Sequence, residues 1–124
     1  MIGIGIDIIE ISRMAETIER SGDIFLKRVF SNDEMQKARL SDNPTKYYAS
    51  AFAAKEAVFK ALTLGWDQEV NFREIEVFRR QSGEPLVRLQ GAVKARANAE
   101  GCHRVLLSLS YETDLAVAMA FAEG

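Results

Sequence analysis

The stretch KYYASAFAAKEAVFKALTL, residues 46–64, decides the fold of this chain. It is rich in alanine, a strong helix former, and its large apolar side chains recur at spacings that put them on related faces of a helix. These apolar residues are Tyr48, Phe52, Phe59 and Leu62. Gly65 follows at a position where a glycine commonly ends a helix. The stretch therefore predicts one long helix that ends near residue 64.

Before this helix, the N-terminal residues alternate between isoleucine and small or charged residues. The period of two predicts a β-strand over residues 2–8 whose two faces differ. One face carries the isoleucines and should be packed, whereas the other carries Gly3, Gly5 and Asp7. Because glycine has no side chain, this second face lets a ligand or another backbone approach the Asp7 carboxylate.

Two shorter helices are expected between this strand and the long helix. Ser12 is a suitable N-cap for the first helix, and Gly22 is a suitable end. Ser31 and Glu34 match the S-x-x-E capping box, which predicts a second helix that ends before the loop at residues 42–44. The first half of the chain is therefore predicted to be rich in helix.

The second half is predicted to be rich in strands. Alternating residues near Ile75 and over residues 86–90 flank a turn at Ser82-Gly83 and indicate a hairpin. After a helix near residues 92–100, two more strands follow. The last strand, residues 115–122, alternates large apolar residues with alanine, so we expect it to be central and closely covered. Without strict strand-helix alternation, the predicted fold class is α+β, with a helix-rich N-terminal half packed on a mainly antiparallel sheet.

Length and composition limit what the chain can be. At 124 residues and 48% hydrophobic composition, it fits a single domain over residues 1–124. Its net charge of −2 lacks the basic excess typical of nucleic-acid binding. Its longest apolar run, residues 115–122, is too short to span a membrane. A single cysteine, Cys102, and the lack of a signal-peptide pattern predict a cytoplasmic protein.

Two carboxylates are candidates for metal binding. Asp7 shares a strand face with the glycines, although a lone aspartate more often ends a strand and caps a turn. Glu56 precedes Lys60 by four residues, a spacing typical of a solvated ion pair. Glu56 also borders the apolar stripe one turn after Phe52, where a carboxylate usually has a cationic or metallic partner. With no nearby cluster of His or Cys, two carboxylates suit Mg²⁺, whose coordination is commonly completed by substrate phosphates.

Three segments together resemble the holo-acyl-carrier-protein synthases, the small homotrimeric type of the 4′-phosphopantetheinyl transferase family. They are GIGIDIIEISRM at residues 3–14, FAAKEAVFKAL at residues 52–62 and SLSYETDLAVA at residues 108–118, and they cover nearly the whole chain in order and spacing. The resemblance implies an enzyme of fatty acid biosynthesis that moves 4′-phosphopantetheine from coenzyme A to a serine of apo acyl carrier protein. The other product is adenosine 3′,5′-bisphosphate.

The resemblance also implies roles for individual residues. Asp7 and Glu56 would hold Mg²⁺ against the coenzyme pyrophosphate, and Lys60 would stabilise charge on the leaving side. Either Glu56 or a water on the metal would accept the serine proton. The residues that would bind coenzyme A are Lys60, Gly65, Ser110 and Tyr111. The implied assembly is a homotrimer with active sites between subunits, in which the GIGID segment of one chain meets the long helix of another.

Arginines near the first predicted helix are candidates for docking the carrier protein. Arg13 and Arg20 are two helical turns apart and share a face, and the bland interpretation is a solvated face with ion pairs to Glu16. The resemblance implies that such arginines bind the acidic carrier protein. Arg13 is the best match, with Arg20 and Arg28 behind it.

Three positions depart from the pattern of similar synthases. Tyr111 stands where a histidine is usual, Ala51 stands where an arginine is common, and Thr63-Leu64-Gly65 replaces Gly-Thr-Gly. Two alternatives therefore stay open: a catalytically degenerate module that binds carrier protein or nucleotide, and a Mg²⁺-dependent nucleotide hydrolase. Retention of Asp7, Glu56 and Lys60 favours the transferase over the degenerate module.

Overall fold

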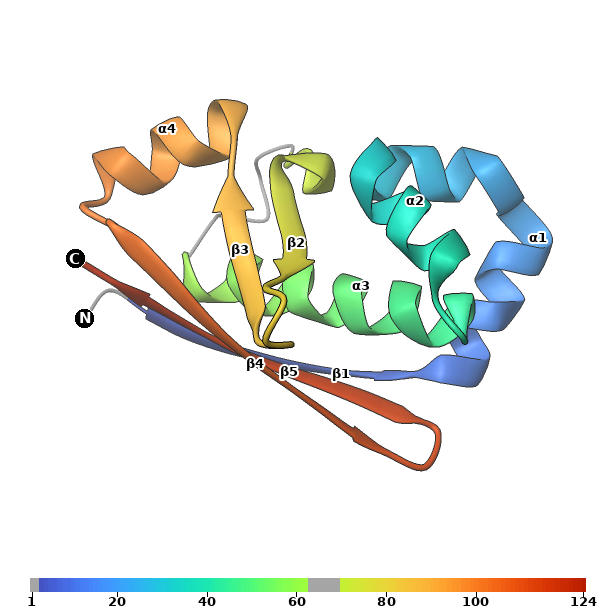
Figure 1. The fold of residues 1–124 in the computed structure, drawn as a ribbon. Helices are drawn as coiled ribbons and strands as arrows, with labels where there is room; N and C mark the ends of the chain where they lie inside the picture. The colour runs from blue at the N-terminus through green and yellow to red at the C-terminus, as the bar shows by residue number, and fades with distance from the viewer. Residues whose placement is uncertain (1–2, 63–69) are drawn as a thin grey trace.

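The computed structural model describes residues 3–62 and 70–124 and has the predicted α+β fold. Figure 1 shows the long helix α3 lying across a sheet, with α1 and α2 at one end of the molecule and α4 at the other. The elements in chain order are β1 (Gly3–Glu10), α1 (Ile11–Val29), α2 (Asn32–Leu40), α3 (Pro44–Ala61), the 3₁₀ turn η1 (Phe72–Glu74), β2 (Ile75–Arg79), β3 (Pro85–Leu89), α4 (Gly91–Ala99), β4 (Arg104–Glu112) and β5 (Leu115–Glu123).

The sheet beneath α3 is antiparallel throughout, with strand order β1-β5-β4. The central place of β5 confirms the prediction made from its alternating sequence. Its alanines are buried, and β5 contacts α3 as well as both neighbouring strands. Its other face is less covered than expected, since Met119 is 44% exposed. The predicted hairpin is also present: β2 and β3 form a separate two-stranded antiparallel sheet.

The glycine face of β1, and not the isoleucine face, is the one that packs against α3. A Cβ atom added to Gly5 would lie 2.0 Å from the carbonyl oxygen of Ala57, and one added to Gly3 would lie 2.0 Å from that of Ala61. Two backbones can approach this closely only where side chains are absent or small. The expectation that the isoleucine face of β1 would be packed was therefore wrong for the single chain. The isoleucines remain more than half exposed: Ile4 at 58%, Ile6 at 55% and Ile8 at 59%.

The start of α1 is fixed by the turn between β4 and β5, not by Ser12. The N-cap residue, Glu10, makes no side-chain capping bond. Instead, the amide of Ser12 donates to Asp114 Oδ1 (3.0 Å) and the amide of Ile11 donates to the Asp114 carbonyl oxygen (2.7 Å). Ser12 was therefore the wrong cap, because the acceptor comes from a segment distant in sequence. At Gly22, where an end was predicted, α1 has a kink with φ 51° and ψ −132°.

A buried ion pair joins α3 to α2 and β2. The Lys55 ammonium lies 2.8 Å from Glu34 Oε1, and it also donates to the carbonyl oxygens of Phe72 (2.9 Å) and Ile75 (2.6 Å). Glu34 closes the predicted capping box with Ser31 at the start of α2. Burial lowers the pKa of Lys55, and the charge of Glu34 opposes that shift. Because both side chains are buried, removing either partner would leave an uncompensated charge in the core.

Within the parts of the chain that the structure describes, no helix is both long enough and apolar enough to cross a membrane.

Candidate active site

Asp7 and Lys60 meet where β1 crosses α3, because the glycines before Asp7 let the strand approach the helix. Lys60 Nζ lies 3.3 Å from Asp7 Oδ1 and donates to the carbonyl oxygen of Ile6 at 3.0 Å. The ion pair of Lys60 is thus with Asp7 across the contact, rather than with Glu56 along the helix. These residues belong to one chain, so the GIGID segment meets the long helix of its own subunit, contrary to the expectation of a meeting between subunits.

Glu56 lies close enough to Asp7 for the two carboxylates to affect each other. Partial burial raises the pKa of Glu56, the negative charge of Asp7 raises it further, and the positive charge of Lys60 opposes both. The structure therefore brings together Asp7, Glu56 and Lys60, the three residues on which the sequence-based hypothesis of a metal and phosphate site depends. Two like charges and one ammonium in a half-buried setting favour the arrival of a further cation.

The donor set at this site fits Mg²⁺ better than a transition metal. Within residues 3–62 and 70–124, no group of three or more His, Cys, Asp or Glu side chains could hold a metal ion. Two carboxylates are nevertheless enough for Mg²⁺, which keeps several waters and shares the rest of its coordination with substrate phosphates. The residues that would hold the ion are Asp7 and Glu56.

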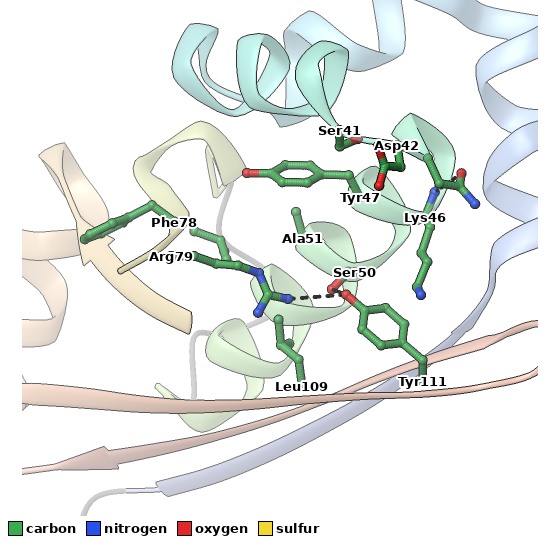
Figure 2. A pocket seen from close by; sticks show the side chains of 12 residues that line it. Ser41, Asp42, Lys46, Tyr47, Ser50, Ala51, Phe78, Arg79, Leu109 and Tyr111 are labelled. Atoms are coloured by element: carbon green, nitrogen blue, oxygen red, sulfur yellow. Dashed lines mark hydrogen bonds between the residues drawn. The ribbon is translucent and has the colours of Figure 1, made fainter. Parts of the chain in front are cut away.

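A separate cavity of about 220 Å³ lies between α3, β2 and β4. Figure 2 shows Arg79 and Tyr111 pointing toward each other, with Lys46 beside the Tyr111 ring. The hydroxyl of Tyr111 donates to Ser50 Oγ (2.9 Å), and Arg79 Nη2 donates to the Tyr111 hydroxyl (3.3 Å). Lys46 Nζ lies 4.1 Å from the centroid of the ring. Ala51 lines the same cavity, so two of the three departures from the synthase pattern lie together.

Sequence reasoning missed Lys46 and Arg79. Lys46 is one charged residue in the first turns of a helix, and Arg79 ends a short strand in a run of two arginines. Neither position has a spacing or motif that separates it from an ordinary surface cation. Lys46 of α3 and Arg79 of β2 meet at Tyr111 of β4 only in the folded chain.

Ser110, another predicted coenzyme contact, does not lie beside Tyr111 in the described part of the chain. Tyr111 pairs with Ala116 of β5 and faces α3, whereas Ser110 pairs with Val117 and points to the opposite face of the sheet. Gly65, with Thr63 and Leu64, lies outside the described residues.

The predicted docking arginines are spread along α1. Arg13 lines an apolar hollow of about 410 Å³ together with Phe25 and Phe52. Arg20 is exposed on the same segment of α1 as Arg13, and Arg28 is exposed beyond the kink at Gly22. Arg13 is thus the one of the three that combines a positive charge with a concave apolar surface.

Comparison with known proteins matches this chain over nearly its full length. The family model of the 4′-phosphopantetheinyl transferase superfamily matches residues 3–120. A holo-[acyl-carrier-protein] synthase of Clostridium kluyveri is 40% identical and aligns over 98% of this chain and 89% of its own. One from Chlamydia trachomatis serovar L2 is 42% identical over 99% of this chain and 100% of its own.

Solved structures are similar as well. The holo-[acyl-carrier-protein] synthase of Neisseria meningitidis has a TM-score of 0.92 at 34% identity, with 100% of both chains covered. The Helicobacter pylori synthase, solved in complex with coenzyme A, has a TM-score of 0.84 at 29% identity, with 97% of this chain and 99% of that chain covered.

The coupling of the two carboxylates predicts how the pKa of Glu56 responds to substitution. Asp7→Asn removes a negative charge and should lower the pKa of Glu56, whereas Lys60→Met removes a positive charge and should raise it. NMR titration of the Glu56 side-chain carboxyl in metal-free buffer measures both changes. Asp33→Asn on α2 is the control and should leave the pKa of Glu56 unchanged. An unchanged pKa in Asp7→Asn would show that the two carboxylates do not share a site.

Proposed function

The chain belongs to the 4′-phosphopantetheinyl transferase superfamily, and from that premise we propose that it transfers 4′-phosphopantetheine from coenzyme A to a serine of an apo acyl carrier protein. The observation that carries the proposal is the meeting of Asp7 with Lys60 and Glu56. These residues come from the two segments that most resemble the synthases, and they lie inside the region that the family model matches. Their retention favours an enzyme over a degenerate binding module.

Each of these side chains has a chemical task in the proposed reaction. Asp7 and Glu56 would hold Mg²⁺, which would supply positive charge against the pyrophosphate of coenzyme A. The serine oxygen of the carrier protein forms a bond to the β-phosphorus, and the bond from that phosphorus to the bridging oxygen breaks. Adenosine 3′,5′-bisphosphate leaves with the electron pair, and Lys60 donates to its phosphate oxygens. Either Glu56 or a water on the metal would accept the serine proton.

Loss of either carboxylate should abolish transfer. We expect Asp7→Asn and Glu56→Gln each to lower the transfer rate by a factor of about 10³ or more, because each removes an anionic ligand with little change in volume. Mass spectrometry of an apo carrier protein incubated with coenzyme A and Mg²⁺ measures the product directly. Asp33→Asn is the control and should transfer normally.

Three results would contradict this assignment. Near-normal transfer by Asp7→Asn or Glu56→Gln would show that the substituted carboxylate does not hold an essential metal ion. Full activity in excess chelator would show that transfer needs no metal ion. Release of adenosine 3′,5′-bisphosphate without any gain of mass by the carrier protein would identify a hydrolase instead of a transferase.

The open face of the sheet supports assembly into a homotrimer. Five large apolar residues expose about half of their surface on β1, β4 and β5, on the side of the sheet away from α3: Ile4, Ile6, Ile8, Leu106 and Met119. A contiguous apolar face of this kind on a small domain typically contacts another protein. The family resemblance implies that the partner is a second and a third copy of this chain.

The assembly can be tested with one charge on the open face. Ile4→Glu places a carboxylate in the proposed interface and should convert a particle with the mass of three chains into single chains in sedimentation velocity. Ile24→Glu is the matched control, because Ile24 is 72% exposed but lies on α1, away from the sheet. A monomeric parent protein, or a trimer that tolerates Ile4→Glu, would exclude this face as the interface.

Docking of the carrier protein is assigned to the Arg13 end of α1. The net charge of −2 provides no global attraction to an acidic partner, so attraction must come from a local patch. The hollow beside Arg13, lined by Phe25 and Phe52, could accept an apolar side chain of the carrier while Arg13 pairs with a carboxylate at the rim. Arg20 and Arg28 are exposed farther along α1 and are the remaining docking candidates.

Charge reversal separates docking from coenzyme binding. Arg13→Glu should raise the KM for carrier protein about tenfold, equivalent to about 1.4 kcal/mol, and leave the KM for coenzyme A nearly unchanged. It should also flatten the salt dependence of kcat/KM, since screening lengths shrink from about 30 Å at 0.01 M salt to about 10 Å at 0.1 M. Lys94→Glu on α4, at the other end of the molecule, is the control. A variant that loses coenzyme affinity but retains carrier affinity would place Arg13 in the nucleotide site instead.

A further inference from the structure

The turn between β4 and β5 holds the junction where β1 ends and α1 begins (Figure 1). The chain passes from Glu10, the last residue of β1, directly into Ile11, the first residue of α1. Asp114 of the turn accepts three hydrogen bonds from this junction. Its carbonyl oxygen accepts from the amide of Ile11 (2.7 Å), Oδ1 from the amide of Ser12 (3.0 Å), and Oδ2 from the hydroxyl of Ser12 (2.5 Å).

The first turn of α1 needs these acceptors, because the first four amides of a helix have no partner within it. Glu10 occupies the N-cap position but makes no side-chain capping bond. The carboxylate of Asp114 provides the capping acceptor instead, and its negative charge is favourable beside the positive end of the helix dipole. The order of the first turn of α1, which contains Arg13, therefore depends on Asp114.

The turn that carries Asp114 adopts an unfavourable backbone conformation. Thr113 has a φ of 55° and is the only residue other than glycine with a positive φ in the described part of the chain. A β-branched residue adopts such a φ at an energetic cost, and glycine is favoured at this kind of turn position. Conformations of this kind persist where surrounding contacts hold them, and they are common at functional sites. Here the hydrogen bonds of Asp114 to α1 are those contacts.

The same junction forms part of the hollow assigned above to the carrier protein. Glu10 and Arg13 line this hollow from the β1–α1 side. Leu115, which follows Asp114 and pairs with Glu10, lines it from β5. On the other side of the junction, Asp7 of the candidate metal site lies on the same strand as Glu10. The hydrogen bonds of Asp114 therefore fix the point that connects the docking surface to the candidate active site.

We propose that Asp114 is a positioning residue for the carrier protein: by capping α1 from the β4–β5 turn, it holds Arg13 where a docked carrier can present its serine to the site at Asp7. This inference rests on the proposed function, because it takes docking at Arg13 as its premise. Charge alone predicts the opposite effect of Asp114. Removing a negative charge near the docking surface should strengthen binding of an acidic carrier, whereas losing the cap should weaken it.

Steady-state kinetics of the full-length protein with apo acyl carrier protein and coenzyme A test the proposal. Asp114→Ala removes both carboxylate acceptors and should raise the KM for carrier protein about fivefold, the size expected for loss of a helix cap, without changing the affinity for coenzyme A. Asp114→Asn and Ser12→Ala each retain part of the contact and should raise this KM by less. Glu112→Gln is the matched control. It removes a negative charge next to the same turn but no acceptor of α1, and should leave the KM unchanged or lower it.

A double-mutant cycle shows whether Asp114 acts through Arg13. If it does, Asp114→Ala should change the KM for carrier protein much less in an Arg13→Gln background than in the parent. Equal effects in the two backgrounds would overturn the inference. An unchanged or lower KM in Asp114→Ala, or an equal weakening of coenzyme A binding, would also overturn it. Ser12 is exposed and Asp114 is partly exposed, so these variants should fold normally.

The outcomes separate this inference from the proposed function. A raised KM for carrier protein in Arg13→Glu, together with a parental KM in Asp114→Ala, would overturn the role of Asp114 alone. A parental KM in Arg13→Glu would overturn the docking assignment and this inference with it, while transfer of phosphopantetheine still stands. A parent protein that modifies no carrier protein would overturn the proposed function itself.

Discussion

The close contact between the backbones of β1 and α3 is the constraint on which the rest of the structure depends. Gly3 and Gly5 let the strand approach the carbonyl oxygens of Ala61 and Ala57, and α3 contributes mainly alanine to the same contact. Asp7 follows these glycines on the same side of the strand and therefore reaches Lys60 and the neighbourhood of Glu56. The same contact turns the isoleucines of β1 outward. The packing of β1 against α3 therefore forms both the candidate active site and the exposed apolar face.

The buried ion pair of Lys55 fixes the rotation of α3 about its axis. Lys55 has no exposed surface and contacts one carboxylate and two carbonyl oxygens. An ammonium in the core is costly unless its donors are paired, so α3 cannot rotate without breaking this arrangement. Because Glu56 is the next residue along the helix, the inward direction of Lys55 also determines that Glu56 emerges toward β1. Adjacent residues of the FAAKEAVFKAL segment thus point in different directions, Lys55 into the core and Glu56 toward the candidate site.

Local patterns in the sequence predicted most elements of the fold, whereas contacts between distant segments were predicted poorly. The capping box of Ser31 and Glu34, the β2–β3 hairpin and the central strand β5 all depend on residues near one another in sequence, and all are present. The packed face of β1 could not be inferred, since isoleucine normally marks the buried side and only the glycine-to-helix contact reverses this. The Asp114 cap of α1 comes from a distant turn.

The same distinction applies to the sites. Asp7, Glu56 and Lys60 could be identified as candidates from the sequence. The glycines before Asp7, the helical spacing of Glu56 and Lys60, and the family resemblance all indicated them, and the structure brings them together. Lys46 and Arg79 carried none, since their meeting at Tyr111 depends on how α3 and β2 lie relative to β4. Ser110 was grouped with Tyr111 by the family resemblance, but neighbouring residues on a strand point to opposite faces.

The placement of Asp7 beside Glu56 also affects how the stability of the chain depends on pH. Burial and Asp7 raise the pKa of Glu56, so its stabilising contribution is present below its unfolded pKa and is lost as pH rises through its folded pKa. Above that pH the folded chain holds two repelling carboxylates, and a bound cation would relieve that repulsion. A carboxylate whose pKa is raised by burial and by a neighbouring carboxylate is a candidate for a functional site.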